Sequence, residues 1–301
     1  MSPHGRTVLR DLGVVLHVPG LMAVASLAVA ALFADAAAAV GFAVTGALSL
    51  GLGQVLFRSF RSAAPMRLRH AMVTAVLSWL VVPAAGAVPF LAVAWGADGT
   101  ASDTVLAFRD PLNALFESMS GFTSTGLTIA DRPSRLPESL LWWRSFSQWV
   151  GGVGVILLML AVFHPSGDAH RLYFSEAHGT TIVPDLNQSV RTIWWIYLGY
   201  TAAAVALLWF TGMEGWQALN YGMTGIATGG FGVTDGSLGD FAARTRLAMM
   251  LVMLAGAVSF AAHFRILTQG RVSILWKDPE HRALFVVLAG GAPSCSLGRT
   301  P

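Results

Sequence analysis

The chain has 301 residues, of which 54% are hydrophobic and only 12% are charged, whereas soluble domains carry about 25% charged residues. This shortfall, with a mean hydropathy of +0.61, excludes an ordinary soluble domain and predicts that most of the surface faces lipid. The net charge of +3 comes from basic residues in short clusters between apolar runs, which is typical of membrane topology and not of nucleic-acid binding. The single cysteine, Cys295, excludes a disulfide framework.

Six segments are apolar over the roughly 20 residues that a helix needs to cross a bilayer. The first two are separated only by a very short link that contains Asp35, so we expect a helical hairpin. The first carries no small-residue cleavage site and is predicted to be a retained span, not a removed signal peptide. Pro83 and Pro89 interrupt the third, where we expect a kink. The six segments are 12–33, 36–57, 71–95, 140–163, 190–212 and 246–267.

Two further apolar stretches, 111–129 and 215–233, are too short to cross, and each ends in a Gly/Thr/Ser cluster. Within them, 113–126 aligns without gaps on 217–230, an offset of 104 residues with identical Ala, Leu, Met and two Gly positions. Each stretch is followed by a predicted span, 140–163 and 246–267, and one glycine in each span aligns with the other at the same offset. These two glycines are Gly152 and Gly256. The sequence therefore predicts a unit of span, short helix, loop and span that occurs twice.

Such loops have a physical use at membrane depth. Non-helical backbone is tolerated there only where it is buried in protein or lines a water-filled cavity. Its carbonyl oxygens can replace the hydration shell of a monovalent cation, and glycine lets the backbone turn because it tolerates positive φ. The C-terminal end of each short helix directs a partial negative charge at the cavity. Two aligned copies favour a cation pore over ordinary outer loops.

Basic residues set the expected orientation, because short cytoplasmic loops carry an excess of Arg and Lys. We expect the N-terminus and the links after the second and sixth segments to be cytoplasmic, and the two short stretches to lie outside. The cytoplasmic set is Arg6, Arg10, Arg58, Arg61, Arg67, Arg69, Arg265, Arg271, Lys277 and Arg282. The outer side also carries arginines, so the bias is incomplete: Arg109, Arg132, Arg135, Arg244 and Arg246.

Several motifs resemble the Trk/Ktr/HKT potassium transporter superfamily. Segment 116–126, Phe-Glu-Ser-Met-Ser-Gly-Phe-Thr-Ser-Thr-Gly, resembles the first pore loop, and 143–156 resembles the span after it. Segment 228–231 resembles the second loop, 259–264 the end of the next span, and 278–282 the entry to a third repeat. The resemblance covers residues from about 10 to 290. It is nearest to the TrkH-type membrane subunit, because two extra spans precede the first repeat.

The resemblance implies an all-α membrane protein in which four span–pore-helix–loop–span repeats surround one central pore. It divides this chain into an N-terminal two-helix hairpin (1–60), a first repeat (61–165), a second repeat (166–270), and the start of a third repeat with an aberrant tail (271–301). The implied selectivity filter is Thr123, Ser124, Thr125, Gly126, Ala227, Thr228, Gly229 and Gly230. The potassium ion is expected at Thr125, Gly126, Gly229 and Gly230.

The implied function is potassium uptake across the bacterial inner membrane, with the N-terminus in the cytoplasm. No enzyme activity is expected, and no cofactor other than the transported potassium ion. The implied partners are a second copy in a homodimer, a cytosolic nucleotide-binding (RCK-type) regulatory subunit and the lipid bilayer, but no nucleic acid. A serine in the first loop is associated with sodium preference in some relatives, so Gly126 favours potassium.

Alternatives stay open at this point. Only two of four repeats are present, and half a filter cannot enclose an ion. We expect a fragment or a broken gene, and we expect the residues after 291 to be a truncation or out-of-frame sequence. There are three other possibilities: two copies that together supply four loops, a non-conducting product, and a sodium-permeable relative. An intramembrane hydrolase or transferase is a weaker alternative, because Ser120 and Thr125 lack a spaced His/Asp partner.

Two kinds of acidic residue have alternative roles. Glu117, inside the first short helix, could attract cations at the pore mouth, since an intramembrane carboxylate is a functional hypothesis by default. It could equally anchor the loop from behind through hydrogen bonds, which is the favoured interpretation. Asp235 and Asp240 are expected outside, either raising the local cation concentration or, as favoured, serving as solvated loop charges.

Overall fold

The computed structural model describes residues 3–163, 186–270 and 273–296, and all regular secondary structure in these ranges is helical. Residues 164–185, which include the end of the first predicted repeat and the start of the second, lie outside the described residues. The longer helices are α1 (Pro3–Leu32), α2 (Ala36–Ser59), α3 (Leu68–Gly86), α4 (Val88–Gly96), α6 (Pro111–Phe122), α7 (Glu138–Phe163), α9 (Leu186–Phe210), α10 (Gly215–Ile226), α11 (Ala243–Ala257), α12 (Phe260–Gln269) and α14 (Pro279–Ser296). The short elements are α5 (Asp103–Leu106), η1 (Ala107–Arg109), η2 (Pro133–Arg135), η3 (Ser237–Asp240) and α13 (Ile274–Lys277).

Four helices among the described residues are long and apolar enough to cross a membrane: α1, α2, the α3–α4 pair over Arg69–Gly96, and α9. Their outer faces carry exposed apolar side chains, as Leu48, Leu52 and Val55 show on α2. In water this surface would be costly, but in a bilayer it meets hydrocarbon. The prediction of an all-α, multi-pass membrane protein is therefore confirmed.

The N-terminal hairpin forms as predicted, and small residues bring its helices together. Asp35 caps α2 by accepting a hydrogen bond from the Ala38 N–H at 3.0 Å. Where α1 and α2 cross, a methyl group added to Gly13 would stand 2.7 Å from the carbonyl oxygen of Gly53, and one added to Gly53 would stand 2.8 Å from that of Gly13. Such backbone contact between membrane helices requires residues without bulk.

The third predicted segment is interrupted where its prolines lie. Helix α3 ends at Gly86, and α4 begins at Val88 with Pro89 in its first turn. Side chains from the first repeat donate to carbonyls at this junction: Ser118 Oγ to Pro83 O at 2.8 Å and Trp143 Nε1 to Gly86 O at 2.9 Å. The interruption thus docks α6 and α7 onto α3.

The sixth predicted segment, 246–267, is not one continuous helix, a feature that the sequence analysis did not predict. Helices α11 and α12 are separated by a short break and bent by 99°. The bend is held locally: Ser259 caps α12 by accepting from the Ala262 N–H at 3.3 Å, and His263 Nε2 bonds the Ala255 carbonyl at 2.8 Å. The apolar run is unbroken across this point, so hydropathy alone could not reveal it.

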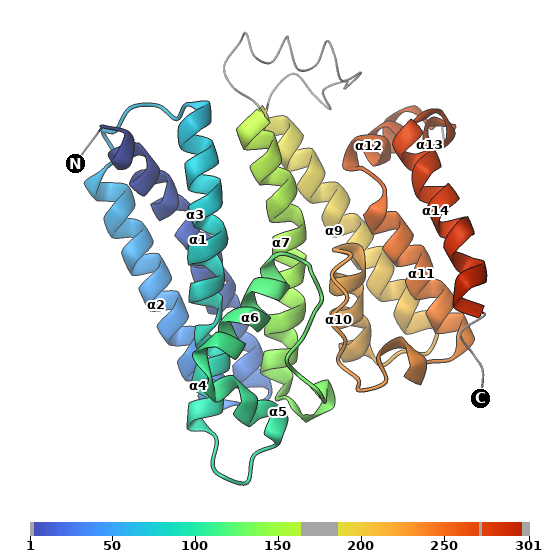
Figure 1. The fold of residues 1–301 in the computed structure, drawn as a ribbon, viewed down its shortest axis with the longest axis horizontal. Helices are drawn as coiled ribbons and strands as arrows, with labels where there is room; N and C mark the ends of the chain where they lie inside the picture. Colours follow the sequence, from blue (N-terminus) through green and yellow to red (C-terminus); the bar gives the residue numbers. More distant parts are fainter. Residues whose placement is uncertain (1–2, 164–185, 271–272, 297–301) are drawn as a thin grey trace.

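The two short apolar stretches contain helices of 12 residues each, α6 and α10. At 1.5 Å per residue each is too short to cross the hydrocarbon core. Figure 1 shows both in the lower half of the bundle, on either side of α7, and α7 packs against both. The helix α7, 26 residues long, is therefore the element shared by the two predicted pore helices.

The close crossing of α1 and α2 gives a test of the hairpin. We expect Gly53→Val to lower the thermal midpoint of the detergent-solubilised protein, because the added side chain must push α1 away at a cost of about 1–3 kcal/mol. Gly51→Val is the matched control, since nothing lies within 4 Å of a methyl group at Gly51. Equal midpoints for the two variants, measured by fluorescence-detected gel filtration after heating, would show that the helices do not cross here.

Candidate functional site

The loops that follow α6 and α10 have the same backbone hydrogen bonds. In the first loop, the Ser124 N–H donates to Gly121 O at 3.0 Å and the Thr125 N–H donates to Ser120 O at 3.0 Å. The equivalent bonds 104 residues later measure 3.0 and 2.8 Å. This is the Schellman arrangement that ends a helix by turning the chain back on its last carbonyls. The sequence repeat is thus also a structural repeat at its loops.

Both loops contain two residues with positive φ at matching positions. Ser124 and Thr228 have φ of 52° and 51°, and Gly126 and Gly230 have φ of 79° and 90°. Glycine adopts this region freely, but for a serine, and more so for a β-branched threonine, it is uncommon. Strain of this kind costs of order 1–3 kcal/mol per residue and gathers at functional sites. The paired strain therefore marks these loops as functional candidates.

The two loops meet each other. A methyl group added to Gly126 would overlap the carbonyl oxygen of Gly229, and one added to Gly230 would stand 3.9 Å from the Gly126 Cα. Gly126 must therefore be glycine for two reasons, its φ and its clearance. The structure brings the predicted filter residues of both repeats together, although they are about a hundred residues apart in sequence.

The helices after the loops, α7 and α11, match each other in the structure at an offset one residue larger than in the sequence alignment. A methyl group on Gly151 would overlap Phe122 O, and one on Gly256 would overlap Ile226 O. The structural partner of Gly256 is thus Gly151, whereas Gly152 faces the second loop and α9. The connection from loop to helix is one residue longer in the second repeat, so the offset rises from 104 to 105 after the loops.

Glu117 forms a buried ion pair with Arg144 of α7. Glu117 Oε1 lies 2.7 Å from Arg144 Nε, and the two side chains are 0% and 1% exposed. Thr128 Oγ1 donates to Glu117 Oε1 and the Ile129 N–H donates to Oε2, both at 2.8 Å. Both carboxylate oxygens are therefore engaged in holding the chain just after Gly126. This geometry favours the anchoring role of Glu117 over a position at the pore mouth.

Arg144 also reaches the second loop. Its Nη1 donates to Gly232 O at 3.0 Å, and its guanidinium carbon lies 4.3 Å from the centre of the Phe231 ring. Its Nη2 donates to Thr128 Oγ1 at 3.0 Å. A planar guanidinium has several donors in a fixed fork, and here the fork joins residues beyond both predicted filter loops.

Gln148, one turn along α7, clamps the second loop directly. Its Nε2 donates to Gly229 O at 2.8 Å, and its Oε1 accepts from the Phe231 N–H at 3.1 Å. The sequence analysis predicted that the Gly229 carbonyl faces the ion. In the structure this carbonyl accepts a hydrogen bond from Gln148 of α7. A methyl group at Gly229 would overlap the Gln148 amide, which explains the glycine at this position.

Sequence reasoning missed Arg144 and Gln148 as site residues. The signal was present: they stand four residues apart in an otherwise apolar span, and residues at that spacing share one face of a helix. An arginine inside a membrane segment is a functional hypothesis by default. The sequence alone could not identify the partners of these side chains, since Gly232 lies 88 residues after Arg144 and Phe231 lies 83 residues after Gln148.

The outer ends of the two repeats are also joined. Asp235, which follows the second loop, accepts from Ser134 N at 3.0 Å and from Ser134 Oγ at 2.7 Å. These bonds, together with nearby Arg132 and Arg135, lower the pKa of the Asp235 carboxyl. Asp235 is therefore an ionised bridge between the repeats and not merely a solvated charge.

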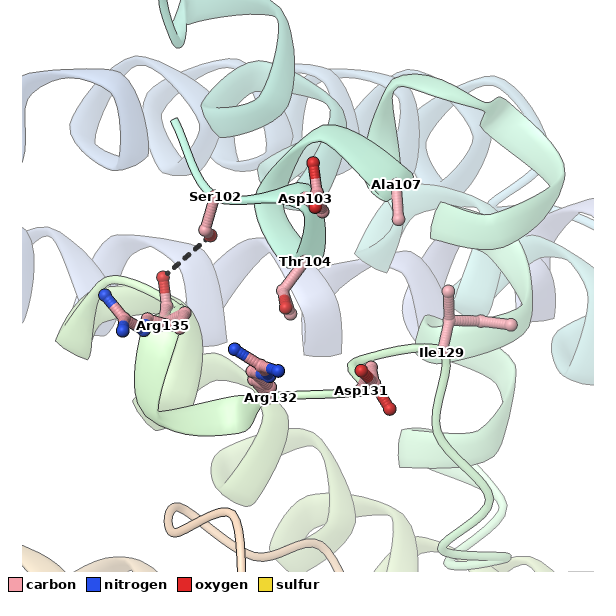
Figure 2. Close-up of a pocket in the computed structure, with 8 residues that line it drawn as sticks. All are labelled: Ser102, Asp103, Thr104, Ala107, Ile129, Asp131, Arg132 and Arg135. Atoms are coloured by element: carbon pink, nitrogen blue, oxygen red, sulfur yellow. Dashed lines mark hydrogen bonds between the residues drawn. The ribbon is translucent and has the colours of Figure 1, made fainter. Parts of the chain in front are cut away.

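A cavity of about 410 Å³ lies near this bridge and is lined by Arg132 and Arg135, the residues on either side of Pro133 and Ser134 (Figure 2). Figure 2 shows the side chains of Arg132 and Asp131 on one wall and Thr104 on the facing wall. None of the predicted filter residues lines it, and its acidic and basic side chains offset each other. The lining is Ser102, Asp103, Thr104, Ala107, Ile129, Asp131, Arg132 and Arg135. Among the described residues no group of His, Cys, Asp or Glu side chains could hold a metal ion.

Known proteins are similar to this chain in sequence and in fold. An uncharacterised cation transporter of Methanocaldococcus jannaschii is 38% identical over 206 residues, which are 67% of this chain and 40% of that protein. The Trk system potassium uptake protein TrkH of Vibrio parahaemolyticus is 32% identical over 291 residues, 94% of this chain and 58% of that one. The crystal structure of the potassium transporter TrkH from Vibrio parahaemolyticus superimposes with a TM-score of 0.77 at 29% identity, covering 94% of this chain and 56% of that chain.

The chain thus spans between two fifths and three fifths of the length of these relatives. The family model described as TrkH, cation transport protein, matches residues 39–293. This match takes in both short helices, both loops and α7. The chain is a multi-pass membrane protein that belongs to the TrkH family of cation transport proteins.

Proposed function

We propose that this chain supplies half of a potassium-conducting pore, with residues 123–126 and 227–230 as two of its selectivity-filter loops. The observation that carries the proposal is the contact between two loops of matching backbone conformation, each placed at the end of a half-length helix. Several relatives are named potassium uptake proteins, which supports potassium as the ion. Two further loops are needed to enclose an ion, and the relatives are long enough to contain them.

The physical basis of conduction is backbone electrostatics. Carbonyl oxygens of the loops replace the water that potassium loses on entry, and the C-terminal ends of α6 and α10 add partial negative charge. No ionised carboxylate stands free at the loops, because Glu117 is paired with Arg144. An ion held by dipoles alone is held weakly enough to leave, and inward movement of one charge gains about 2.3 kcal/mol per 100 mV of membrane potential.

The same proposal divides the chain into the hairpin (1–60), two pore repeats (61–165 and 166–270) and the start of a third (271–301). It places the N-terminus in the cytoplasm of a bacterial cell, since the basic residues of the α1 start and the α2–α3 link lie at the end away from the filter loops (Figure 1). A homodimer and a nucleotide-binding regulatory subunit at that end follow from the family resemblance alone.

The filter glycine gives the most direct test. In the complete transporter that contains this sequence, we expect Gly126→Ala to reduce potassium uptake at least tenfold, because the methyl group would overlap Gly229 O and φ of 79° is unfavourable for alanine. Uptake is measured as rubidium influx in a bacterium lacking its own potassium transporters. Gly199→Ala, where nothing lies within 4 Å of the added methyl group, is the control; wild-type influx through the Gly126 variant at equal protein level would end the filter assignment.

The buried ion pair gives a second test. We expect Arg144→Gln to destabilise the protein by about 3–5 kcal/mol, because removing one partner leaves a buried charge uncompensated. Adding Glu117→Gln should recover part of that loss, since neither side chain then carries a charge. Thermal midpoints in detergent report stability, and the potassium-to-rubidium and potassium-to-sodium influx ratios report the filter. Arg246→Gln, at an exposed arginine of α11, is the control; additive effects of the two substitutions would show that the pair is not coupled.

A further inference from the structure

Two cavities lie beside the first turn of α1, at the end of the bundle away from the filter loops (Figure 1). The first, of about 430 Å³, lies between the start of α1 and the start of α3 and is lined by His4, Gly5, Val8, Leu9, Arg69, His70 and Val73. The second, of about 460 Å³, lies between the start of α1 and the end of α2 and is lined by Pro3, Arg6, Ser59, Phe60, Ser62, Ala63 and Ala64. No carboxylate lines either cavity.

The first cavity has apolar walls and a basic rim. Its polar side chains touch one another: Arg69 Nη2 lies 3.0 Å from His4 Nε2, and His4 Nδ1 lies 3.0 Å from His70 Nε2. Among the described residues, Arg69 forms no ion pair with a carboxylate. The Arg69 guanidinium has five N–H donors and engages His4 through Nη2, so it supplies positive charge and further donors to an anion at the rim.

The apolar walls of this cavity continue into the surface that faces the bilayer. On α3, large apolar side chains follow Arg69 on the outward face and are between 48% and 64% exposed: Met72, Val73, Val76 and Leu80. Val73 belongs both to the cavity and to this surface. A ligand seated at the rim would therefore have water and charge at one end and hydrocarbon at the other. Only an amphipathic molecule matches both ends.

The basic rim is held in place by the link between α2 and α3. Arg10 donates from Nη1 to the carbonyls of Ala63 and Ala64 at 3.2 and 3.3 Å, and Thr7 Oγ1 donates to Ala64 O at 3.2 Å. Arg10 is also paired with Asp11 at 2.7 Å. The nearby carboxylate is thus already neutralised, and Arg6 remains on the wall of the second cavity to add positive charge.

We propose that this end of the bundle binds an anionic phospholipid, with the phosphate at Arg69 and His4 and an acyl chain along Val73 and the outward face of α3. Basic pockets between membrane helices on the cytoplasmic side recognise such headgroups. A soluble phosphate compound would satisfy the rim but leave the apolar groove uncovered. The site is distinct from the filter loops and does not depend on the pore assignment, but it rests on the proposed orientation with this end in the cytoplasm.

The test uses the purified chain in nanodiscs of phosphatidylcholine with increasing fractions of phosphatidylglycerol, and native mass spectrometry to count retained anionic lipids. We expect Arg69→Gln to weaken retention about fivefold, the change associated with removing one basic residue near a membrane surface. His4→Ala, an exposed position in the first turn of α1, should weaken it in the same direction without disturbing α3. Arg61→Gln is the matched control, because Arg61 belongs to the same link but lines neither cavity.

Each outcome decides the proposal. Weaker retention in the Arg69 and His4 variants, with the Arg61 variant unchanged, supports it. Equal loss in all three variants overturns it in favour of diffuse attraction to a basic surface. The last comparison is between the thermal midpoints of the chain in two kinds of nanodisc: pure phosphatidylcholine with millimolar inorganic phosphate, and phosphatidylcholine with phosphatidylglycerol. Equal midpoints overturn the proposal in favour of a free anion.

Discussion

The buried pair of Glu117 and Arg144 is the interaction on which both loops depend. A carboxylate and a guanidinium removed from water lose several kcal/mol of hydration each, and only good geometry with further hydrogen bonds compensates. Here both carboxylate oxygens and all three guanidinium nitrogens have partners. These partners come from the helix α6, the chain after the first loop and the chain after the second. The charge that stabilises the pair therefore also fixes the relative position of the loops.

With the proposed function, this arrangement separates the residues that support the loops from those that would contact the ion. Charged and amide side chains of α7 lie behind the loops and take up backbone groups that would otherwise be unsatisfied at membrane depth. The residues at the contact, Gly126 and Gly230, contribute backbone only. Both residues have positive φ, and at Gly126 the nearby Gly229 carbonyl also excludes a side chain, so the loops meet through backbone atoms. Such a surface can coordinate a weakly held ion without offering it a full charge.

Much of the fold followed from elementary patterns. Hydropathy located the hairpin, the spans and the two half-length helices, because membrane helices must be apolar over a fixed length. The repeat located both loops, because matching residues adopt matching backbone. The bend at Ser259 was missed, since a short break inside an apolar run leaves no hydropathy signal. The register of Gly151 was missed because a one-residue insertion between loop and helix cannot be seen when the intervening residues differ.

The loop supports show where the repeat stops being symmetrical. At the offset of 105, Arg144 corresponds to Met249 and Gln148 to Met253, both on α11. Val252 lies against Gly225 just as Ser147, its counterpart on α7, lies against Gly121, and Met249 also packs there. The packing is thus retained while the polar groups are lost. A methionine can neither pair with a carboxylate nor donate to a carbonyl. Helix α7 therefore holds both described loops through charged and amide side chains. At the corresponding positions, α11 can hold a loop only by packing. The two described loops are therefore joined through polar contacts of α7 that α11 does not offer at the corresponding positions.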